Sequence, residues 1–581
     1  MRLCHLIPLL VFVLGASCAL LVFGFGIANP LNTRWMTGDT VTMQFGWTQY
    51  RDDPTQMFSL TTNRASWPLP MHVALFDNVP LVAFMLRPIA QWLPRDFQYL
   101  GPLFVVGAGL QAVFGWLLLR EATRDRQPHP SRAHHIALAI VALFFATAPM
   151  LYVRFFMGHP ALTQHWTLLA ALWLYTRASR VGVGASVVGF ALLLGGVGGI
   201  NPYLLVMNLL IYAAFVLHMA RRGGLTWAKW CALVMPIAVA SVALVAFGFF
   251  DPASAGVLPG VGYGYFSANM NALMNPMPDY LGSSLLPPLP LASPLQYEGY
   301  GYLGLGALAV VVVGVVLALR RGEMPAPLLM TALIALLIAL SRNVTFGREA
   351  VAFPLPEVLL NVLIVFRSSG RFIWVVGYIL LFIGLASLIR AMKPRHALAA
   401  LTCAALLQMA DLAGPLWRMH QRFALNTPIR FTDPIYAHLG RANDTLLVMP
   451  PWQCGPWSYK RGITKLSYAG SAFEPFSRLA ADNHLRTNSF YAGRLPMDQA
   501  HFHCEIFPLR FATNAPDRRT VYLLSLDAFD RYADHLRTTH YCDFADDFFI
   551  CRADLGKIGV SPRAARARQL IPTAQNFHIA L

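Results

Sequence analysis

A carboxylate just beyond the first apolar run has neighbours that could support chemistry at a membrane surface. Asp39 follows Gly38 in the stretch Arg34-Trp35-Met36-Thr37-Gly38-Asp39-Thr40. The apolar run before it, from Leu6 to Ile27, is about long enough to cross the roughly 30 Å of hydrocarbon in a bilayer. There, a carboxylate could take a proton from a polar acceptor while a lipid-borne donor stays anchored. On spacing alone, a cap or turn carboxylate at a helix start is an equally good interpretation.

Cationic side chains at two later places could hold a leaving phosphate at the same surface. The candidates are Arg154, His159 and His165, and the cluster Arg367-Ser368-Ser369-Gly370-Arg371. The second cluster is the more specific, because arginines, hydroxyls and a glycine at a helix entry suit an anion. Snorkelling arginines and a turn histidine at His159 are the structural alternatives. Asp77, in the loop of Asp39, is a further substrate-binding candidate or else the cap of an interfacial helix.

The composition is that of a polytopic membrane protein. Hydrophobic residues make up 56% of the 581 residues and charged residues only 13%, against about 25% in soluble proteins. The net charge of +17 accompanies no basic patch interleaved with aromatic residues, which argues against a nucleic-acid partner. Short basic loops between membrane spans account for the excess.

Apolar runs separated by basic loops predict about eleven membrane spans with the amino terminus in the cytoplasm. Val73 to Leu93 is apolar but interrupted by Asp77, Pro80 and Arg87, so interfacial helices are expected there. If residues 73–93 crossed the membrane, every later basic loop would face the periplasm, contrary to the rule that basic loops face the cytoplasm. After the first span, the predicted spans are 97–119, about 135–152, one ending near Tyr175, two flanking Asn201-Pro202-Tyr203, about 225–250, two ending near Arg320 and Leu340, 372–390, and one ending near Ala410.

This topology divides the chain into a transmembrane domain, residues 1–412, and a periplasmic domain, residues 413–581. The first includes a periplasmic loop, 29–96. Strand-like runs in the second, at Thr445 to Met449, Thr520 to Leu524 and Asp547 to Cys551, predict a small α/β fold. The basic tail after Asp554 contains Lys557, Arg563, Arg566 and Arg568 and is expected to be a flexible arm.

Four of the 8 cysteines, Cys454, Cys504, Cys542 and Cys551, fall in this last domain. An even set in a domain placed outside suits disulfides in an oxidising periplasm. Cys542 and Cys551 flank a possible hairpin and are the preferred pair, which leaves Cys454 with Cys504. A zinc site is the alternative, although no Cys-x-x-Cys spacing supports it.

At these residues the chain resembles the GT-C class of membrane glycosyltransferases. The shared features are an acidic residue in the first outer loop, interfacial helices before the second span, about eleven spans and an outer carboxy-terminal domain. More closely, it resembles an uncharacterised bacterial membrane family near that class. The matching stretches are Gly38-Asp39-Thr40, Gly46-Trp47, Tyr50-Arg51, Phe97-Gln98-Tyr99, Gly158-His159-Pro160, Phe366-Arg367-Ser368-Ser369-Gly370-Arg371-Phe372 and Pro450-Pro451-Trp452-Gln453-Cys454.

The resemblance implies that Asp39 is a catalytic base or helps to hold a metal, with a polyprenyl-phosphate sugar as donor. A divalent metal such as Mg or Mn would then be a cofactor. Many members of the class carry a second acidic residue after the third span, where this chain has His159, Gln164 and His165. That departure puts both the metal and the catalysis in question.

The expectation is therefore a bacterial inner-membrane glycosyltransferase that transfers a hexose or pentose from a polyprenyl-phosphate donor to a periplasmic glycan, lipid or envelope polymer. Asp39 would be the base, and Arg367 and Arg371 would bind the phosphate. The alternative is a non-catalytic membrane component of envelope polysaccharide assembly or transport. The predicted spans contain almost no charged residues, which argues against an ion-coupled transporter.

Overall fold

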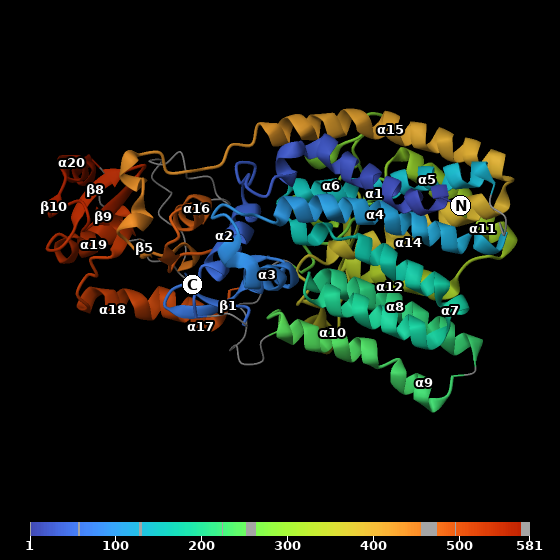
Figure 1. Cartoon of the computed structure of the whole chain (residues 1–581), viewed down its shortest axis with the longest axis horizontal. Coiled ribbons are helices and arrows are strands. Elements are labelled where there is room, and N and C mark those ends of the chain that lie inside the picture. Colours follow the sequence, from blue (N-terminus) through green and yellow to red (C-terminus); the bar gives the residue numbers. More distant parts are fainter. Residues whose placement is uncertain are drawn as a thin grey trace. The chain divides into compact units, whose positions relative to one another are not determined.

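The computed structural model describes residues 2–55, 59–126, 131–223, 225–250, 263–454, 473–493 and 495–570. The chain divides into two compact units (Figure 1). Unit 1 comprises Met1–Trp35, Phe97–Phe247 and Pro259–Asn426. Unit 2 comprises Met36–Asp96, Gly248–Leu258 and Thr427–Leu581. The three predicted strand-like runs and the loop of Asp39 thus both belong to unit 2.

Unit 1 is built of apolar helices that lie side by side (Figure 1). In the part of the chain that is described, eight helical segments are long and apolar enough to cross a membrane, which is consistent with a multi-pass membrane protein. Helix α1 packs on α4, and α11 packs on α14 and α15. The helices are α1 (Arg2–Phe23), α4 (Leu100–Ala122), α5 (Arg132–Ala146), α6 (Pro149–Phe156), α7 (Trp166–Gly198), α8 (Pro202–Arg222), α9 (Trp227–Ala232), α10 (Met235–Ala246), α11 (Leu305–Arg321), α12 (Ala326–Leu340), α13 (Glu357–Leu363), α14 (Ile373–Ala391) and α15 (Pro394–Ala424).

Helix α7 reverses direction at Gly182. This glycine has φ 84° and ψ 172°, which is outside the helical region. A Cβ on Gly189 would lie 2.8 Å from the Leu174 side chain, whereas fifteen residues of straight helix span roughly 22 Å. The two halves of α7 therefore form an antiparallel helical hairpin, and positive φ makes glycine the favoured residue at the turn.

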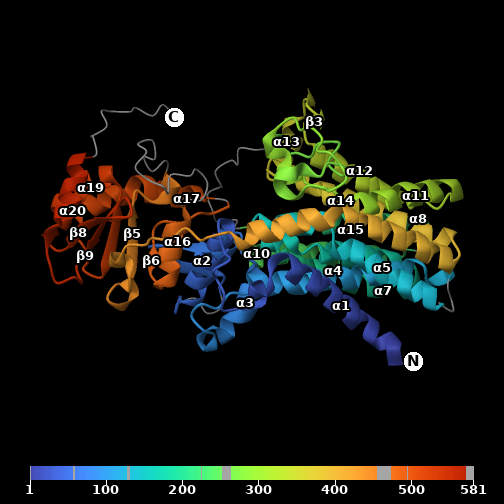
Figure 2. The same ribbon diagram turned by 90° about the horizontal axis from the view of Figure 1, so that it is seen from above.

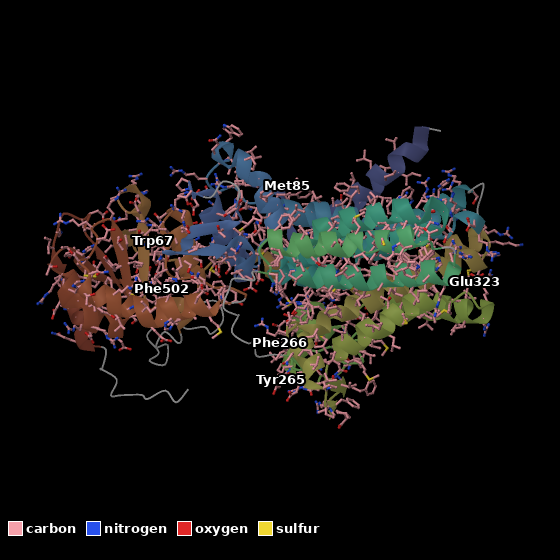
Figure 3. All side chains as sticks on the ribbon, turned by 90° about the horizontal axis from the view of Figure 1, so that it is seen from below. Trp67, Met85, Tyr265, Phe266, Glu323 and Phe502 are labelled. Atoms are coloured by element: carbon pink, nitrogen blue, oxygen red, sulfur yellow. A yellow bond between two sulfur atoms is a disulfide. The ribbon has the colours of Figure 1, made fainter. Side chains whose placement is uncertain are left out.

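Ion pairs join several of the short basic loops at one end of unit 1. Glu323 lies 3.2 Å from Arg126 and 3.4 Å from Arg390. Arg180, beside the reversal in α7, pairs with Glu121 at 2.7 Å. Figure 3 shows Glu323 at this end and Phe266 at the opposite end of the unit.

Unit 2 is organised around a six-stranded mixed sheet with the strand order β10-β8-β9-β7-β5-β6. Strand β5 pairs in parallel with β6 and β7, and β9 pairs antiparallel with β7 and β8. The sequence correctly predicted β5 and β7. The strands are β5 (Thr445–Met449), β6 (Arg486–Thr487), β7 (Thr520–Leu524), β8 (Tyr541–Ala545), β9 (Phe548–Arg552) and β10 (Gly559–Val560).

Both faces of this sheet are apolar, because alternate residues of each strand point to opposite sides. Leu447 and Met449 pack in a core with helices α18 (Phe507–Thr513), α19 (Leu526–Leu536) and α20 (Pro562–Leu570). Leu446 and Val448 pack in a second core with α16 (Phe473–Asp482). Figure 2 shows the strands between α19 and α20 on one side and α16 and α2 on the other.

The loop of Asp39 completes the second core. Phe45 of α2 (Asp39–Arg51), Met71 of the hairpin β1 (Thr61–Ser66) and β2 (Leu69–His72), and Phe76 are buried together with Leu446 and Val448. Gln49 Nε2 donates to the carbonyl of Leu485 over 2.8 Å. The sequence-based division assigns 29–96 to the transmembrane domain, whereas the contacts group 36–96 with the C-terminal residues. The apolar face of the sheet, which sequence alone does not reveal, accounts for the difference.

Residues 73–93 contain only short helical segments, including α3 (Pro80–Leu86), as the interrupted pattern predicts. Four large apolar side chains there are exposed, namely Phe84, Met85, Ile89 and Trp92 (Figure 3 labels Met85). Arg51 donates to the carbonyls of Ala90, Leu93 and Pro94, so its charge caps the end of this segment.

The expectation of a flexible arm after Asp554 is wrong for the described part of the tail. Residues 559–570 form β10 and α20, and Ala564 is fully buried. Arg563 bonds to Asp433 at 2.7 Å and to Asp543 at 3.0 Å, and Arg568 pairs with Asp530 at 2.7 Å. The tail contains no acid of its own, but the sheet and α19 supply partners. Residues 571–581 lie outside the described part of the chain.

Candidate functional site

A buried ion cluster in unit 1 joins three segments that are far apart in the sequence. Arg154, near the end of α6, places Nη1 2.7 Å from Glu298 Oε2. Arg371, in the turn before α14, places Nε 2.8 Å from the same oxygen and Nη2 3.1 Å from Oε1. Arg154 also donates to the carbonyls of Tyr297 and Glu298. We call these three residues the Arg154–Glu298–Arg371 cluster.

Glycine is required where the turns of Glu298 and Arg371 meet. A Cβ on Gly370 would lie 2.7 Å from Cα of Gly299, closer than real atoms approach. The amide of Gly370 donates to the carbonyl of Phe266 over 2.9 Å. The glycine in Ser-Ser-Gly-Arg therefore serves close backbone packing, which brings the Arg371 side chain to Glu298.

The cluster carries a surplus of positive charge in a buried place. Two guanidinium groups and one carboxylate leave one positive charge, and Arg154 is fully buried. Burial alone raises the pKa of Glu298, but Arg154 and Arg371 outweigh burial and hold that pKa well below its usual range. Burial lowers the pKa of His159 to about 3, so this histidine is neutral. A buried net positive charge favours the binding of an anion.

Arg367 is the exposed member of the predicted phosphate-binding motif. Its guanidinium lies over the Phe266 ring, 5.4 Å from the centroid. The amide of Ser368 donates to the Tyr203 hydroxyl over 3.0 Å. Within the described residues, the buried Ser369 hydroxyl has no hydrogen-bond partner. Of the predicted motif, Arg371 thus belongs to the ion cluster, whereas Arg367 remains available at the surface.

His165 is buried in the helices rather than exposed in a loop. Its Nδ1 lies 2.9 Å from the Tyr378 hydroxyl, which also accepts a hydrogen bond from Gln111. The Trp374 ring lies 4.5 Å from the His165 ring and 5.3 Å from the Arg154 guanidinium. His165 therefore packs behind the cluster and supports Trp374.

In unit 2, Asp39 is the first residue of α2, and Gly38 rather than Asp39 occupies the cap position. Gly38 before it has φ 55° and ψ −129°, a conformation that favours glycine. The Gly38 amide donates to Glu474 Oε2 over 2.9 Å. Arg478 Nη2 donates to the carbonyl of Met36 over 2.7 Å and lies 3.4 Å from Glu474. We call Glu474 and Arg478 the Glu474–Arg478 pair.

This buried pair holds the turn of Asp39 from both sides. One member contacts an amide and the other a carbonyl of the three residues that precede Asp39. The sequence analysis missed both residues, as it missed Glu298. The sequence around these residues gives little indication of a functional role. A single acid in an aromatic stretch such as Tyr297-Glu298-Gly299-Tyr300 has many structural explanations.

Asp77 has left-handed backbone dihedral angles, φ 54° and ψ 19°, at the end of the turn Val73–Phe76. A Cβ on Gly493 would lie 2.8 Å from its Oδ1. Asp77 occupies the C-cap position of this short helical segment, which agrees with the expected cap of an interfacial helix.

The structure contains both expected disulfides, Cys454–Cys504 and Cys542–Cys551. Cys542 and Cys551 are directly opposite each other on β8 and β9. Among the residues that the structure describes, no group of three His, Cys, Asp or Glu side chains is arranged to hold a metal ion.

Comparison with known families identifies two matching models. A model described as Domain of unknown function (DUF6311) matches residues 12–413, and the DUF6311 C-terminal domain matches residues 435–553. No curated protein matches the chain. Because the first model alone covers more than half of the sequence, the chain belongs to the DUF6311 family.

Proposed function

We propose that this protein is a bacterial inner-membrane glycosyltransferase of the GT-C kind. It would transfer a sugar from a polyprenyl-phosphate donor to a periplasmic glycan, lipid or envelope polymer. The observation that carries the proposal is the buried Arg154–Glu298–Arg371 cluster, whose surplus positive charge lies beside the exposed Arg367. Departure of a phosphate from the anomeric carbon generates negative charge, which such cations stabilise.

A count of about eleven crossings agrees with the contacts within unit 1. Eight segments qualify by length, the reversal in α7 divides one of them, and α11 and α12 add two shorter apolar helices. Predicted inner loops pair with one another through Glu323 and Glu121. Predicted outer loops meet at the Arg154–Glu298–Arg371 cluster. Both groupings support the proposed sidedness.

The shared core of unit 2 supports an odd number of crossings. Residues 36–96 and 427–570 pack in one core, so a bilayer cannot pass between them. The chain between residues 96 and 427 must then cross an even number of times, and α1 adds one crossing. The proposed eleven crossings satisfy this condition.

The two disulfides support a periplasmic position for unit 2. Disulfides persist in oxidising compartments and are rare in the cytosol. Because Asp39 belongs to the same unit as all four cysteines, the proposal places this carboxylate in the periplasm as well.

In the proposed reaction, Asp39 takes the proton from the acceptor hydroxyl as that oxygen attacks the anomeric carbon. The bond to the phosphate breaks, and Arg367 together with the cluster stabilises the leaving phosphate. The described residues do not fit a protein-held Mg or Mn ion, since Glu474 next to the Asp39 turn is occupied by the amides of Gly38 and Ile429. No step of the proposal requires a metal.

The alternative is a non-catalytic component of envelope polysaccharide assembly or transport. One observation favours it: both Glu298 oxygens are bonded to arginines, so the cluster could serve stability alone.

A deletion strain complemented with wild type or with Asp39→Ala separates the two functions. The measurements are the surface glycans and the accumulated polyprenyl-linked sugars, with equal protein levels in the membrane as control. Loss of a glycan that only wild type restores supports the transferase and identifies the sugar. Restoration by both forms contradicts the transferase and favours the scaffold.

A further inference from the structure

The chain between α12 and α14 presents an apolar surface that is not covered by the rest of unit 1. It consists of the hairpin β3 (Asn343–Phe346) and β4 (Glu349–Ala352), followed by α13. We call the exposed side chains Val351, Phe353, Val358, Leu359 and Val362 the α13 surface. Figure 2 shows α13 and β3 projecting from the neighbouring helices.

α13 has no buried residue, and its two sides differ in exposure. Leu360 and Leu363 are half-buried, whereas Val358 is 81% exposed and Val362 is 59% exposed. Exposed apolar side chains that are concentrated in one segment mark a candidate site of interaction. Its chemistry calls for an apolar occupant.

The position in the chain indicates that the occupant is a lipid chain. The hairpin begins directly after α12, an apolar helix whose Leu333 and Leu337 are also exposed. Apolar surface therefore continues from a helix suited to contact lipid onto α13.

The charge pattern argues against a general bilayer anchor. Interfacial helices that bind anionic bilayers are rich in lysine and arginine on their polar face. The stretch from Glu349 to Phe366 contains Glu349 and Glu357 and no cation. Cations flank this stretch on both sides. Arg342 and Arg348 precede it, on either side of β3, and the exposed Arg367 and Arg371 of the ion cluster follow it.

An apolar surface that ends at a surplus of positive charge is complementary to an amphiphile with one long apolar chain and one anionic end. We propose that the α13 surface binds the isoprenoid chain of a polyprenyl phosphate whose phosphate is bound by Arg367. This inference rests on the proposed function, because the lipid is the donor of that reaction or the carrier that it releases.

Binding to the purified full-length protein in zwitterionic nanodiscs tests the proposal. The probes are a long-chain polyprenyl phosphate and citronellyl phosphate, a short analogue with the same head. The test variant is Val358→Ser, Leu359→Ser and Val362→Ser combined. The matched control is Val312→Ser, Val313→Ser and Val316→Ser combined on α11, which changes exposed residues with the same spacing on another apolar helix.

We expect the α13 variant to bind the long-chain phosphate at least about tenfold more weakly, because three apolar contacts are lost. Its affinity for citronellyl phosphate should be unchanged, and the α11 variant should resemble wild type with both probes. Arg367→Gln should weaken the binding of both probes.

Equal long-chain affinity in the α13 variant and wild type would overturn the proposal, as would an equal loss in the α11 variant. A photo-crosslinker at Val358 provides a second readout in cells. Adducts with polyprenyl phosphate support the proposal, and adducts mainly with protein overturn it. If binding behaves as expected but the wild-type protein transfers no sugar from a polyprenyl-phosphate donor, the transferase fails while the lipid site stands.

Discussion

The two units contain buried charged residues in different proportions. In unit 1, one carboxylate, Glu298, faces two arginines, so the cluster retains a positive charge. In unit 2, Glu474 and Arg478 balance each other, and both also bond to backbone groups of the turn before Asp39. Removing one partner of a buried ion pair destabilises the folded protein, because the other charge stays buried without compensation. Each arrangement therefore depends on all of its charged residues.

The difference indicates different tasks. A balanced pair with backbone partners is complete and can fix the geometry of a turn. A cluster with surplus positive charge favours the approach of an additional anion. Unit 1 thus has the features of a binding site, and unit 2 has those of a rigid support for one carboxylate.

The largest expected effect separates the two tasks directly. Asp39→Asn should lower the rate of sugar transfer by about 10²- to 10⁴-fold, the usual contribution of a general base, while thermal stability stays close to wild type. Transfer by the purified protein and its melting temperature are the measurements. Asp96→Asn, an exposed acid of the same unit, is the control and should retain activity. A normal rate for Asp39→Asn would remove the catalytic role from unit 2.

The second prediction concerns the surplus charge. Glu298→Gln leaves two buried arginines without their carboxylate and should destabilise the protein by about 3 to 5 kcal/mol. Glu323→Gln is the control, since Glu323 also faces several arginines but is partly exposed, and its loss should cost about 1 kcal/mol or less. Thermal unfolding in the same detergent measures both. Equal losses of stability in the two variants would show that burial does not make the Arg154–Glu298–Arg371 cluster more important for stability than the exposed ion pairs of Glu323.

A smaller loss is expected in the balanced pair. Glu474→Gln keeps an oxygen that can accept from the Gly38 amide but removes the charge opposite Arg478. We expect about 1 to 3 kcal/mol of destabilisation and increased hydrogen exchange in residues 36–41. Unchanged exchange there would contradict the supporting role of the pair.

Acid should destabilise unit 1 through His159. The folded-state pKa of about 3 lies below the usual value near 6.5, so the unfolded chain binds a proton that the folded chain excludes. Stability is then fully present above about pH 6.5 and falls as the pH is lowered toward the folded pKa.

His159→Gln should therefore reduce the loss of stability between about pH 7 and pH 5 by roughly 2 kcal/mol. The exposed His501→Gln serves as control. Glu298, whose pKa is also lowered, contributes stability above its unfolded-state value near 4.3 and adds to the loss below that pH. An identical pH profile for His159→Gln and wild type would contradict the neutral, buried state of His159.

The smallest effect on stability is expected at Arg367. Because this side chain is exposed, Arg367→Gln should change the free energy of unfolding by about 0.5 kcal/mol or less. Its effect should appear instead in affinity for phosphate lipids, which a binding titration measures. A large loss of stability would assign Arg367 to structure rather than to binding.

Local patterns were sufficient to predict the elements but not their partners. Strands β5 and β7 follow from short apolar runs, and the short helical segments at 73–93 follow from the interruptions in that stretch. Asp39 at a helix start follows from Gly38. The pairing of Cys542 with Cys551 follows from a hairpin, whose strands place the two residues opposite each other.

The ion cluster and the supporting pair depend on contacts between distant segments. Glu298 is separated from Arg154 by 144 positions, and Glu474 is separated from Gly38 by 436. No local periodicity encodes such pairs. The same limitation explains the tail, where Arg563 is stabilised by acids from β8 and from the segment before β5.

The shared core of unit 2 also determines when this protein can finish folding during synthesis. Phe45 and Phe76 leave the ribosome early, whereas Leu446 and Val448, which cover them, are made only after the whole of unit 1. At typical elongation rates the interval is on the order of tens of seconds. During that time the apolar side chains of the early loop lack the strands that cover them, so its maturation depends on protection from aggregation and proteolysis until the carboxy-terminal strands arrive.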